Sequence, residues 1–252
     1  MLTTQRKKLI LDRLYQKGEV VAKALSQELA ISEDTIRRDL RELAQEGKLQ
    51  RVHGGALPVS AAMAALDVRQ TIAPTDKQAL GRAGAAMVKH GQLIFLDGGT
   101  TALQVAAHLD PGLRATVVTH SPTVAVELAQ KPHLEIIMLG GTLFRHSMVN
   151  VGAAVIEAAT RMRADLYFMG VTGVHPGVGL STGDHEEAAV KRALHACAAE
   201  TVVLASQEKL GAASPFVIAP LHALAALVVP PQTAVETVEA YRAAGVKVLV
   251  GA

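Results

Sequence analysis

Seven short, mostly apolar runs in the C-terminal two thirds of the chain place the strongest constraint on its fold. They occupy residues 93–96, 115–119, 134–139, 166–169, 201–205, 223–229 and 246–250. Runs of this length that are apolar at nearly every position are typical of strands buried in a parallel sheet. Segments with helical patterns separate most of them, at 102–109, 123–130, 153–162 and 186–198. A further helix is predicted before the first run, capped by Thr75-Asp76-Lys77 and running to about His90. The alternation predicts an open, mainly parallel α/β sheet.

Glycines and hydroxyl-bearing residues follow these predicted strands at the points where they end. The stretches are Asp97-Gly98-Gly99-Thr100-Thr101, Thr119-His120-Ser121, Gly140-Gly141-Thr142 and Gly170-Val171-Thr172-Gly173, and Lys209 follows the next strand. Ligands of open α/β sheets bind beyond the carboxyl ends of the strands, and a helix that begins there favours an anion. We therefore expect one shared pocket at this edge of the sheet, suited to a phosphate group.

Three of these candidates also have a plain structural interpretation. The stretch 97–101 is compatible with an ordinary strand-to-helix turn. Glu187 stands four residues before Lys191 in a predicted helix and near its start, where acidic residues are favoured by the helix dipole alone. Lys209 is compatible with a solvated loop lysine. These alternatives stay open at the level of the sequence.

The N-terminal sixty residues show a different pattern, in which three short helices precede a hairpin. Apolar spacing predicts helices over 4–17 and 21–29, with a tight turn at 30–31. Ser32 is a good N-cap for a third helix, whose apolar stripe is Ile36, Leu40 and Leu43. Residues 49–52 and 56–59 read as two strands joined by a His53-Gly54-Gly55 turn. The arrangement predicts a winged helix-turn-helix.

The third helix presents cationic side chains away from its apolar stripe. Arg37 and Arg41 lie one turn apart, and Arg38 lies beside them. Arginine on an exposed helix can bind guanine edges or phosphates in a major groove. The alternative is a solvated face on which Glu33/Arg37, Asp34/Arg38 and Arg38/Glu42 form ion pairs. We expect DNA contacts from exposed polar residues of the helix and wing: Ser32, Thr35, Arg37, Arg38, Arg41, Arg51 and His53.

The composition of the chain excludes several classes of protein but does not by itself identify a function. The formal net charge is only +2, although residues 1–58 carry 11 Lys and Arg against 8 Asp and Glu. The single cysteine, Cys197, rules out an intrachain disulfide and fits a reducing compartment. The start of the chain does not resemble a signal peptide, and the longest nearly apolar run, 219–231, is too short to span a bilayer. The histidines show no paired ligand spacing. We expect a soluble, cytoplasmic protein with no metal, no cofactor and no membrane partner.

Two groups of motifs resemble the DeoR family of bacterial repressors. In the N-terminal part they are Ser32, Thr35-Ile36-Arg37-Arg38-Asp39-Leu40 and Leu43, followed by Val52-His53-Gly54-Gly55-Ala56. Residues 75–250 resemble the C-terminal sensor domain of that family, which is similar in fold to ribose-5-phosphate isomerase. The resemblance implies an effector pocket at the strand ends, formed by Asp97, Gly99, Thr100, Thr101, Ser121, Gly140, Gly141, Gly170, Gly173, Glu187 and Lys209.

Three positions depart from the family pattern. His120 stands where the family usually has asparagine, and we include it among the effector-binding candidates. Ser206 stands where an aspartate usually precedes the lysine, which removes an acceptor for a sugar hydroxyl. Ala30 occupies a turn position where glycine is common. The first two departures bear on which ligand the pocket holds.

The domain organisation that we expect has three parts. Residues 1–58 form a winged helix-turn-helix DNA-binding domain, and 59–74 form a linker of shifted composition that acts as a hinge. Residues 75–252 form an α/β domain for effector binding and oligomerisation.

These features together favour a transcriptional regulator. We expect a repressor of a carbohydrate-catabolism operon that binds double-stranded operator DNA as a homodimer or homotetramer and is released by a phosphorylated sugar, a sugar acid or a related metabolite. An activator remains open. The alternative from another class is a sugar-phosphate isomerase with a DNA-binding appendage, in which Asp97, His120, Glu187 and Lys209 supply acid–base chemistry. The loop 169–173 lacks the carboxylates of the comparable isomerase loop, so we expect binding without catalysis.

Overall fold

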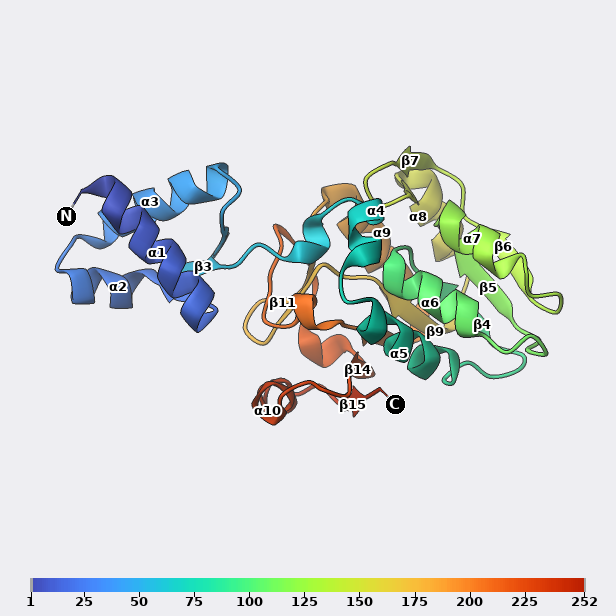
Figure 1. Ribbon diagram of the computed structural model, residues 1–252. Coiled ribbons are helices and arrows are strands. Elements are labelled where there is room, and N and C mark those ends of the chain that lie inside the picture. Colours follow the sequence, from blue (N-terminus) through green and yellow to red (C-terminus); the bar gives the residue numbers. More distant parts are fainter. Residues whose placement is uncertain (1, 252) are drawn as a thin grey trace.

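The alternating C-terminal segments form a seven-stranded parallel sheet in the computed structural model, which describes residues 2–251 (Figure 1). The strands lie in the order β15-β14-β12-β9-β4-β5-β6. Their bounds are β4 (Leu93–Leu96), β5 (Thr116–Thr119), β6 (Glu135–Met138), β9 (Ala164–Met169), β12 (Ala198–Leu204), β14 (Ala226–Val229) and β15 (Val248–Val250). Every neighbouring pair is parallel, so all seven carboxyl ends meet at one edge. The predicted parallel α/β sheet is confirmed.

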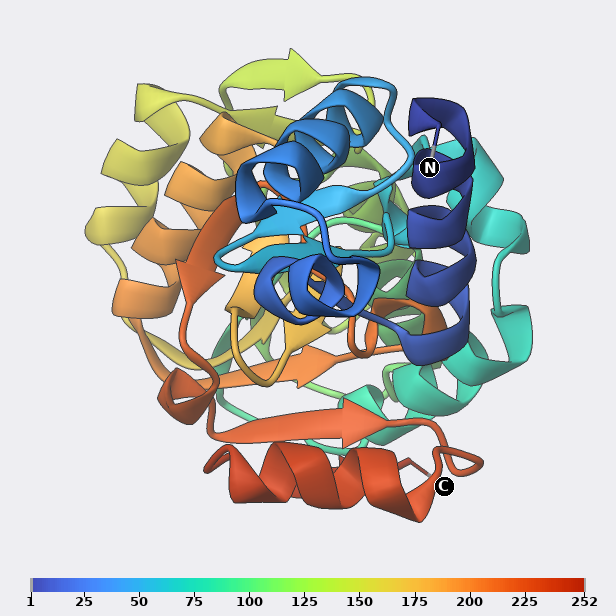
Figure 2. The ribbon, with the colours of Figure 1, turned by 90° about the vertical axis from the view of Figure 1, so that its left-hand side faces the viewer.

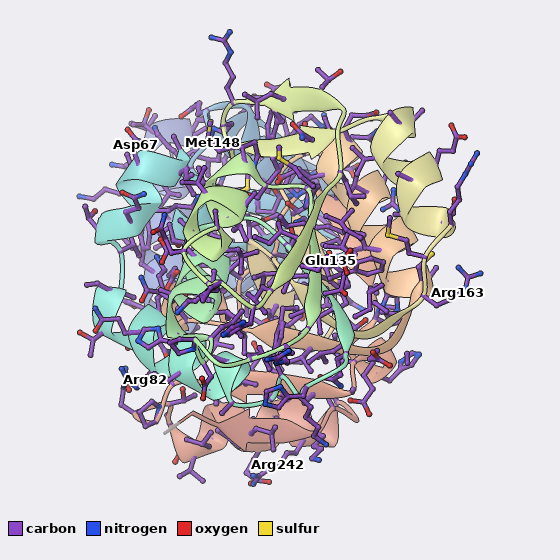
Figure 3. All side chains as sticks on the ribbon, turned by 90° about the vertical axis from the view of Figure 1, so that its right-hand side faces the viewer. Asp67, Arg82, Glu135, Met148, Arg163 and Arg242 are labelled. Carbon is purple, nitrogen blue, oxygen red and sulfur yellow. The ribbon has the colours of Figure 1, made fainter. Side chains whose placement is uncertain are left out.

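Helices cover both faces of this sheet. One face packs against α5 (Pro74–Ala85), α6 (Thr100–His108) and α7 (Pro122–Leu128), and the other against α8 (Ala153–Thr160), α9 (His185–Ala196) and α10 (Val235–Ala243). Alternate side chains of a strand enter the two cores: Ile94 and Leu96 join the first, whereas Phe95 joins the second. Figure 3 shows the open edge of the sheet at β6, with Glu135 labelled, on the side away from the N-terminal domain.

Several short antiparallel strands supplement the main sheet and were not predicted from the sequence. A hairpin is formed by β7 (Thr142–Phe144) and β8 (Val149–Val151), and a small sheet by β10 (Gly173–His175), β11 (Gly179–Thr182) and β13 (Phe216–Ala219). Segments of three or four residues carry too little periodicity to be recognised alone. The small sheet covers the same face as α9, since Val174, Leu180 and Ile218 pack in the core that contains Val190.

Helix α5 starts and ends differently from the sequence prediction. Thr75, Asp76 and Lys77 do not cap it; the helix begins at Pro74, after Ala73 with φ of 45°. Proline suits the first helical position because the amide hydrogen that it lacks has no partner there. The helix ends at Ala85 rather than near His90.

The N-terminal domain is a winged helix-turn-helix, as predicted (Figure 2). Its elements are α1 (Thr3–Lys17), β1 (Val20–Val21), α2 (Ala22–Leu29), α3 (Glu33–Gln45), β2 (Gln50–Val52) and β3 (Gly55–Leu57). The wing is a three-stranded sheet in the order β1-β3-β2, because β1 pairs with β3. Ala30 ends α2 in a left-handed conformation with φ of 52°, which explains why glycine is suited to this turn.

An ion pair between Arg6 and Asp39 joins α1 to α3 inside this domain. Both Nε and Nη2 of Arg6 donate to the Asp39 carboxylate, and both residues are buried. The pair was not predicted, although Asp39 falls at the spacing of the apolar stripe formed by Ile36, Leu40 and Leu43. A carboxylate at a buried helical position requires a cationic partner, which that spacing alone could have indicated.

The predicted linker contains two short helices that pack on the α/β domain. They are a 3₁₀ turn, η1 (Ala61–Met63), and α4 (Leu66–Thr71). The Leu66 amide donates to the carbonyl oxygen of His146 at 3.1 Å, and Ala62 is buried. In Figure 1 this segment leads from β3 to the α/β domain and runs along the side of that domain that faces the viewer. The boundaries 1–58, 59–74 and 75–252, and the role of 59–74 as a hinge, stay predictions.

Candidate functional site

The first candidate surface is the exposed face of α3. The Ser32 hydroxyl caps this helix by accepting the Thr35 amide at 3.3 Å, and it lies 2.9 Å from the Thr35 hydroxyl. Ile36, Leu40 and Leu43 are buried, whereas Arg37, Arg38 and Arg41 are exposed. The apolar stripe therefore faces the domain core, and the three arginines project from the opposite side.

The arginines differ in how their charge is already compensated. Arg37 donates twice to Glu33, at 2.7 and 3.0 Å, so the surface-pair interpretation holds at this position. Glu42 pairs with Lys7 at 2.9 Å instead of with Arg38. Among the described residues, neither Arg38 nor Arg41 forms an ion pair. These two side chains are therefore available to an external anion without first breaking an internal contact.

The wing contributes two further cationic or titratable positions. Arg51 lies in β2 and is exposed, and His53 is exposed in the turn between β2 and β3. Gly54 follows with φ of 80°, a conformation that the tight turn requires and that other residues rarely adopt. Both side chains lie in the same small domain as α3 but on a separate element.

The second candidate site is a cavity at the carboxyl edge of the parallel sheet. Its walls come from the loop before α6, the end of β9, the start of α9, the turn after β12 and the predicted linker. Four cationic side chains from four separate elements line it: Arg69 from α4, Lys77 from α5, Lys191 from α9 and Lys209 from η2 (Gln207–Lys209). Glu187 and Glu208 are the acidic side chains among the lining residues. The cavity therefore gathers more positive than negative charge.

Burial raises the energy of these clustered cations. It lowers the pKa of Lys209 to about 8, an effect that Glu208 opposes and that Lys77, Arg69 and Lys191 strengthen. Burial likewise lowers the pKa of Arg69 and that of Lys77. An anion among these groups would offset both the desolvation and the mutual repulsion. The electrostatics of the cavity thus favour an anionic ligand.

The loop before α6 supplies the polar floor of this cavity. Gly99 has φ of 102° and precedes the first turn of α6, in which Thr100 and Thr101 are buried. Lys209 Nζ donates to the Thr101 hydroxyl at 3.3 Å. A helix N-terminus next to glycines and a lysine suits a phosphate group, because its free amides and dipole favour negative charge.

Asp97 lies beneath this floor and is fully buried. Its Oδ1 accepts from the Gly98 amide at 2.7 Å, and its Oδ2 accepts from the Gly170 amide and the Tyr167 hydroxyl at 2.8 Å each, and from Lys191 Nζ at 2.7 Å. Burial raises the pKa of Asp97, but the Lys191 ammonium and His120 outweigh it and hold the pKa well below its usual range. Asp97 therefore fixes the two glycine loops from below.

His120 and Ser121 support the same buried network. Nε2 of His120 lies 2.8 Å from Oδ1 of Asp97, and Nδ1 lies 2.7 Å from the Asn150 carbonyl oxygen, so both ring nitrogens face acceptors. The Ser121 hydroxyl donates to the carbonyl oxygen of Met148 at 3.1 Å. Both side chains are fully buried.

The structure separates the predicted pocket residues into two groups. Those that line the cavity are Gly99, Thr100, Thr101, Gly170, Glu187 and Lys209. Those that lie outside its lining are Asp97, His120, Ser121, Gly140, Gly141 and Gly173. Gly140 and Gly141 are exposed between β6 and β7. A side chain at Gly173 would meet the Ala212 carbonyl oxygen at 2.6 Å, so this glycine serves close packing.

The contacts and burial of Glu187 and Lys209 bear on the structural alternatives that the sequence left open. Lys191 pairs with Asp97, while Glu187 accepts from the Thr182 hydroxyl at 3.3 Å. Lys209 is buried and is not a solvated loop lysine. Ser206 is also buried and donates to Glu208 Oε1 at 2.7 Å.

Sequence reasoning missed three of the four cations. Arg69 was assigned to the linker 59–74, and Lys77 to a helix cap. Lys191 was seen only as a helical partner of Glu187. A usable signal existed for Lys77 and Lys191, since each lies at the spacing of buried apolar residues on its helix. No local signal marks Arg69.

Two other features are absent from residues 2–251. No three His, Cys, Asp or Glu side chains in this range gather closely enough to hold a metal ion. None of the helices in the same range combines the length and apolar character needed to cross a bilayer.

Comparison with known proteins identifies relatives of both domains. Residues 6–62 match the family model of the DeoR-like helix-turn-helix domain, and residues 72–230 match that of the DeoR C-terminal sensor domain. The chain is 32% identical to the HTH-type transcriptional regulator GlpR of Haloferax volcanii, over 100% of this chain and 99% of the relative. It is 31% identical to the glycerol-3-phosphate regulon repressor of Escherichia coli, over 84% of each chain. Among solved structures, ribose 5-phosphate isomerase A of Methanocaldococcus jannaschii aligns with a TM-score of 0.41 and 18% identity over 54% of each chain.

Proposed function

The chain belongs to the DeoR family of DNA-binding transcriptional regulators, and from this premise we propose that it represses a carbohydrate-catabolism operon until a phosphorylated sugar or related metabolite binds. It is a regulator and not an enzyme. The observation that carries the effector half of the proposal is the convergence of Arg69, Lys77, Lys191 and Lys209 on the loop that begins α6.

The DNA-binding half of the proposal rests on α3 and the wing. Arg38 and Arg41 are exposed on the face of α3 opposite the domain core and form no ion pair among the described residues. Arginine in this position can bind base edges in the major groove, while Arg51 and His53 reach the neighbouring backbone. Arg37 joins the interface once its pair with Glu33 opens.

We expect Arg38→Ala to weaken operator binding by about 1–3 kcal/mol, because a guanidinium that reads a base edge is lost. The measurement is fluorescence anisotropy with duplexes that tile the DNA upstream of the protein's own gene, at moderate salt and against a random duplex. Arg82→Ala is the matched control, since Arg82 is an exposed arginine of α5 in the sensor domain (Figure 3). Equal affinities of Arg38→Ala and the wild type at every salt concentration would remove Arg38 from the interface.

The effector half of the proposal follows from charge. Phosphate monoesters carry close to two negative charges at neutral pH and match a cluster of buried cations beside a helix N-terminus. The glycerol-3-phosphate regulon repressor of E. coli, by its name, controls genes of a phosphorylated three-carbon compound. This relative supports the same class of ligand for the cavity of the present chain. Glycerol 3-phosphate is therefore the first compound to titrate, followed by sugar phosphates and sugar acids.

Binding of such an anion should weaken as the pH rises through about 8, since burial lowers the pKa of Lys209 to about 8. Below that pH the ammonium form attracts the anion, and above it the lysine is neutral and the attraction is lost. A bound anion raises this pKa, so binding near pH 8 takes up protons. Calorimetric titrations from pH 7 to 9.5 in two buffers measure both effects. Lys209→Arg keeps its charge over this range and should flatten the profile; an unchanged profile would show that another group controls binding.

The proposal includes a homodimer or homotetramer and a cytoplasmic location. A single winged helix contacts too little DNA for high specificity, and a two-fold symmetric operator requires the DNA-binding domains of two copies of the chain. An effector that favours one spacing of these two domains needs only about 1–3 kcal/mol of coupling free energy to change the occupancy of the operator. Regulation of chromosomal DNA supports a location in the cytoplasm. Sedimentation of the full chain with and without an operator duplex tests the assembly.

A further inference from the structure

The linker helix α4 carries the cavity residue whose donors are least satisfied. Nε and Nη2 of Arg69 are buried, and no hydrogen-bond partner for either exists among the described residues. The guanidinium lies against the glycine loop, since a side chain at Gly99 would come within 3.6 Å of Nη1. Buried donors without acceptors are costly, and a guanidinium presents a planar set that matches two phosphate oxygens. Arg69 is therefore poised for an anion in front of α6.

The backbone that carries Arg69 is attached to the sensor domain at both ends of α4. Lys77 Nζ donates to the carbonyl oxygens of Arg69 and Ile72, each at 2.5 Å, and so compensates the negative end of this short helix. At the other end, the backbone carbonyl oxygen of His146 accepts from the Leu66 amide at 3.1 Å, and Nε2 of the His146 ring lies 3.0 Å from the Met63 carbonyl oxygen. Arg69 therefore lies on a short segment whose two ends are both hydrogen-bonded to residues of the sensor domain.

The beginning of the linker touches the same cavity through a second element. The turn η2 supplies two lining residues, Glu208 and Lys209. Ser60 donates to the Glu208 carbonyl oxygen at 3.3 Å, and Val59 forms an isolated bridge with Ala213. Ser60 lies only three residues after β3 of the wing. One cavity therefore contacts both the start of the linker and its α4 helix.

We propose that Arg69 is the residue through which the bound effector controls the linker, and with it the placement of the DNA-reading domain. This inference rests on the proposed function of the cavity and adds its route of regulation. The anion binds the free donors of Arg69, so that residues 60–77 adopt one position on the sensor domain, whereas Lys209 contributes only to the affinity for the anion. DNA binding then depends on whether that position matches the operator.

Arg69→Gln in the full chain separates sensing from DNA binding. We expect operator affinity without ligand to stay within about twofold of the wild type, because Arg69 lies outside α3 and the wing. Affinity for glycerol 3-phosphate, or for inorganic phosphate as the minimal probe, should fall about tenfold or more, as expected for the loss of charge-assisted hydrogen bonds. At ligand concentrations that saturate the variant by calorimetry, the operator should remain bound.

Hydrogen exchange of residues 60–77 gives a readout that does not involve DNA. In the wild type, glycerol 3-phosphate should slow exchange across this segment, and in Arg69→Gln the slowing should be absent even at saturation. Lys209→Gln is the comparison within the cavity: its affinity falls, but saturating ligand should still slow exchange and release the operator. Arg69→Lys retains the charge but loses the planar set of donors. If Arg69→Gln does not fold, the same two measurements, operator release and hydrogen exchange of residues 60–77, are made on Arg69→Lys.

Two results would overturn the inference while leaving the proposed function intact. One is an Arg69→Gln protein that releases the operator as the wild type does at saturating ligand. The other is wild-type protein whose exchange in 60–77 does not respond to a ligand that releases the operator. If the wild type binds no duplex specifically or is released by no anion, the proposed function itself fails. The matched control Arg82→Gln should behave as the wild type in every arm.

Discussion

Asp97→Ala is expected to lower the free energy of unfolding of the sensor domain by about 3–5 kcal/mol, the range for removal of one partner from a buried ion pair. The Lys191 ammonium would keep its burial and lose its counter-ion at 2.7 Å. The amides of Gly98 and Gly170 and the Tyr167 hydroxyl would lose their acceptor as well. Urea denaturation of the full chain, followed by a probe in the sensor domain, measures the change.

Charge and shape can be separated at this position. Asp97→Asn retains the volume but still leaves Lys191 unpaired, so we expect it to be destabilising too. The double variant Asp97→Asn/Lys191→Met removes both charges and should recover part of the loss, which a double-mutant cycle quantifies. Glu236→Ala, at an exposed position of α10, should change stability by no more than about 0.5 kcal/mol. A midpoint for Asp97→Ala equal to that of Glu236→Ala would contradict the assigned role.

Asp39→Ala is expected to destabilise the N-terminal domain by about 3–5 kcal/mol for the same physical reason. The Arg6 guanidinium, buried against α3, would lose both of its contacts with the carboxylate. Because the domain is small, a loss of this size should unfold much of it and abolish operator binding, while the sensor domain stays folded. Hydrogen exchange in α1 and α3, compared with exchange in the parallel sheet, checks this separation.

A partly exposed pair between the same two helices provides the control. Lys7 and Glu42 join α1 to α3 at 2.9 Å, and their side chains are 21% and 43% exposed. Lys7→Ala should cost no more than about 1 kcal/mol, as expected for a partly solvated pair. Arg6→Met/Asp39→Leu replaces the buried pair by apolar side chains and should restore most of the stability. An Asp39→Ala domain as stable as Lys7→Ala would show that burial does not govern this pair.

Much of the fold could be read from the sequence because its signals are local. The strands β4, β5, β6, β9, β12, β14 and β15 were each predicted from an apolar run, and α3 from its cap at Ser32 and the stripe of Ile36, Leu40 and Leu43. The short strands β7, β8, β10, β11 and β13 were missed, because a few residues carry no reliable period. The start of α5 was misplaced because its N-cap is Ala73, whose positive φ is unusual for alanine and cannot be recognised from residue propensity.

By itself, the sequence determined that two parts are present, a winged helix and a parallel sheet whose strand ends share one edge, because these follow from periods and caps within a few residues. Only the tertiary structure decided which side chains meet there. Lys191 reaches Asp97 across 94 positions of the chain, and Arg6 reaches Asp39 across 33. Arg69 enters the cavity from a segment without a local signal. Such contacts depend on how distant elements pack, and the burial of several cations in one cavity is what favours an anion there.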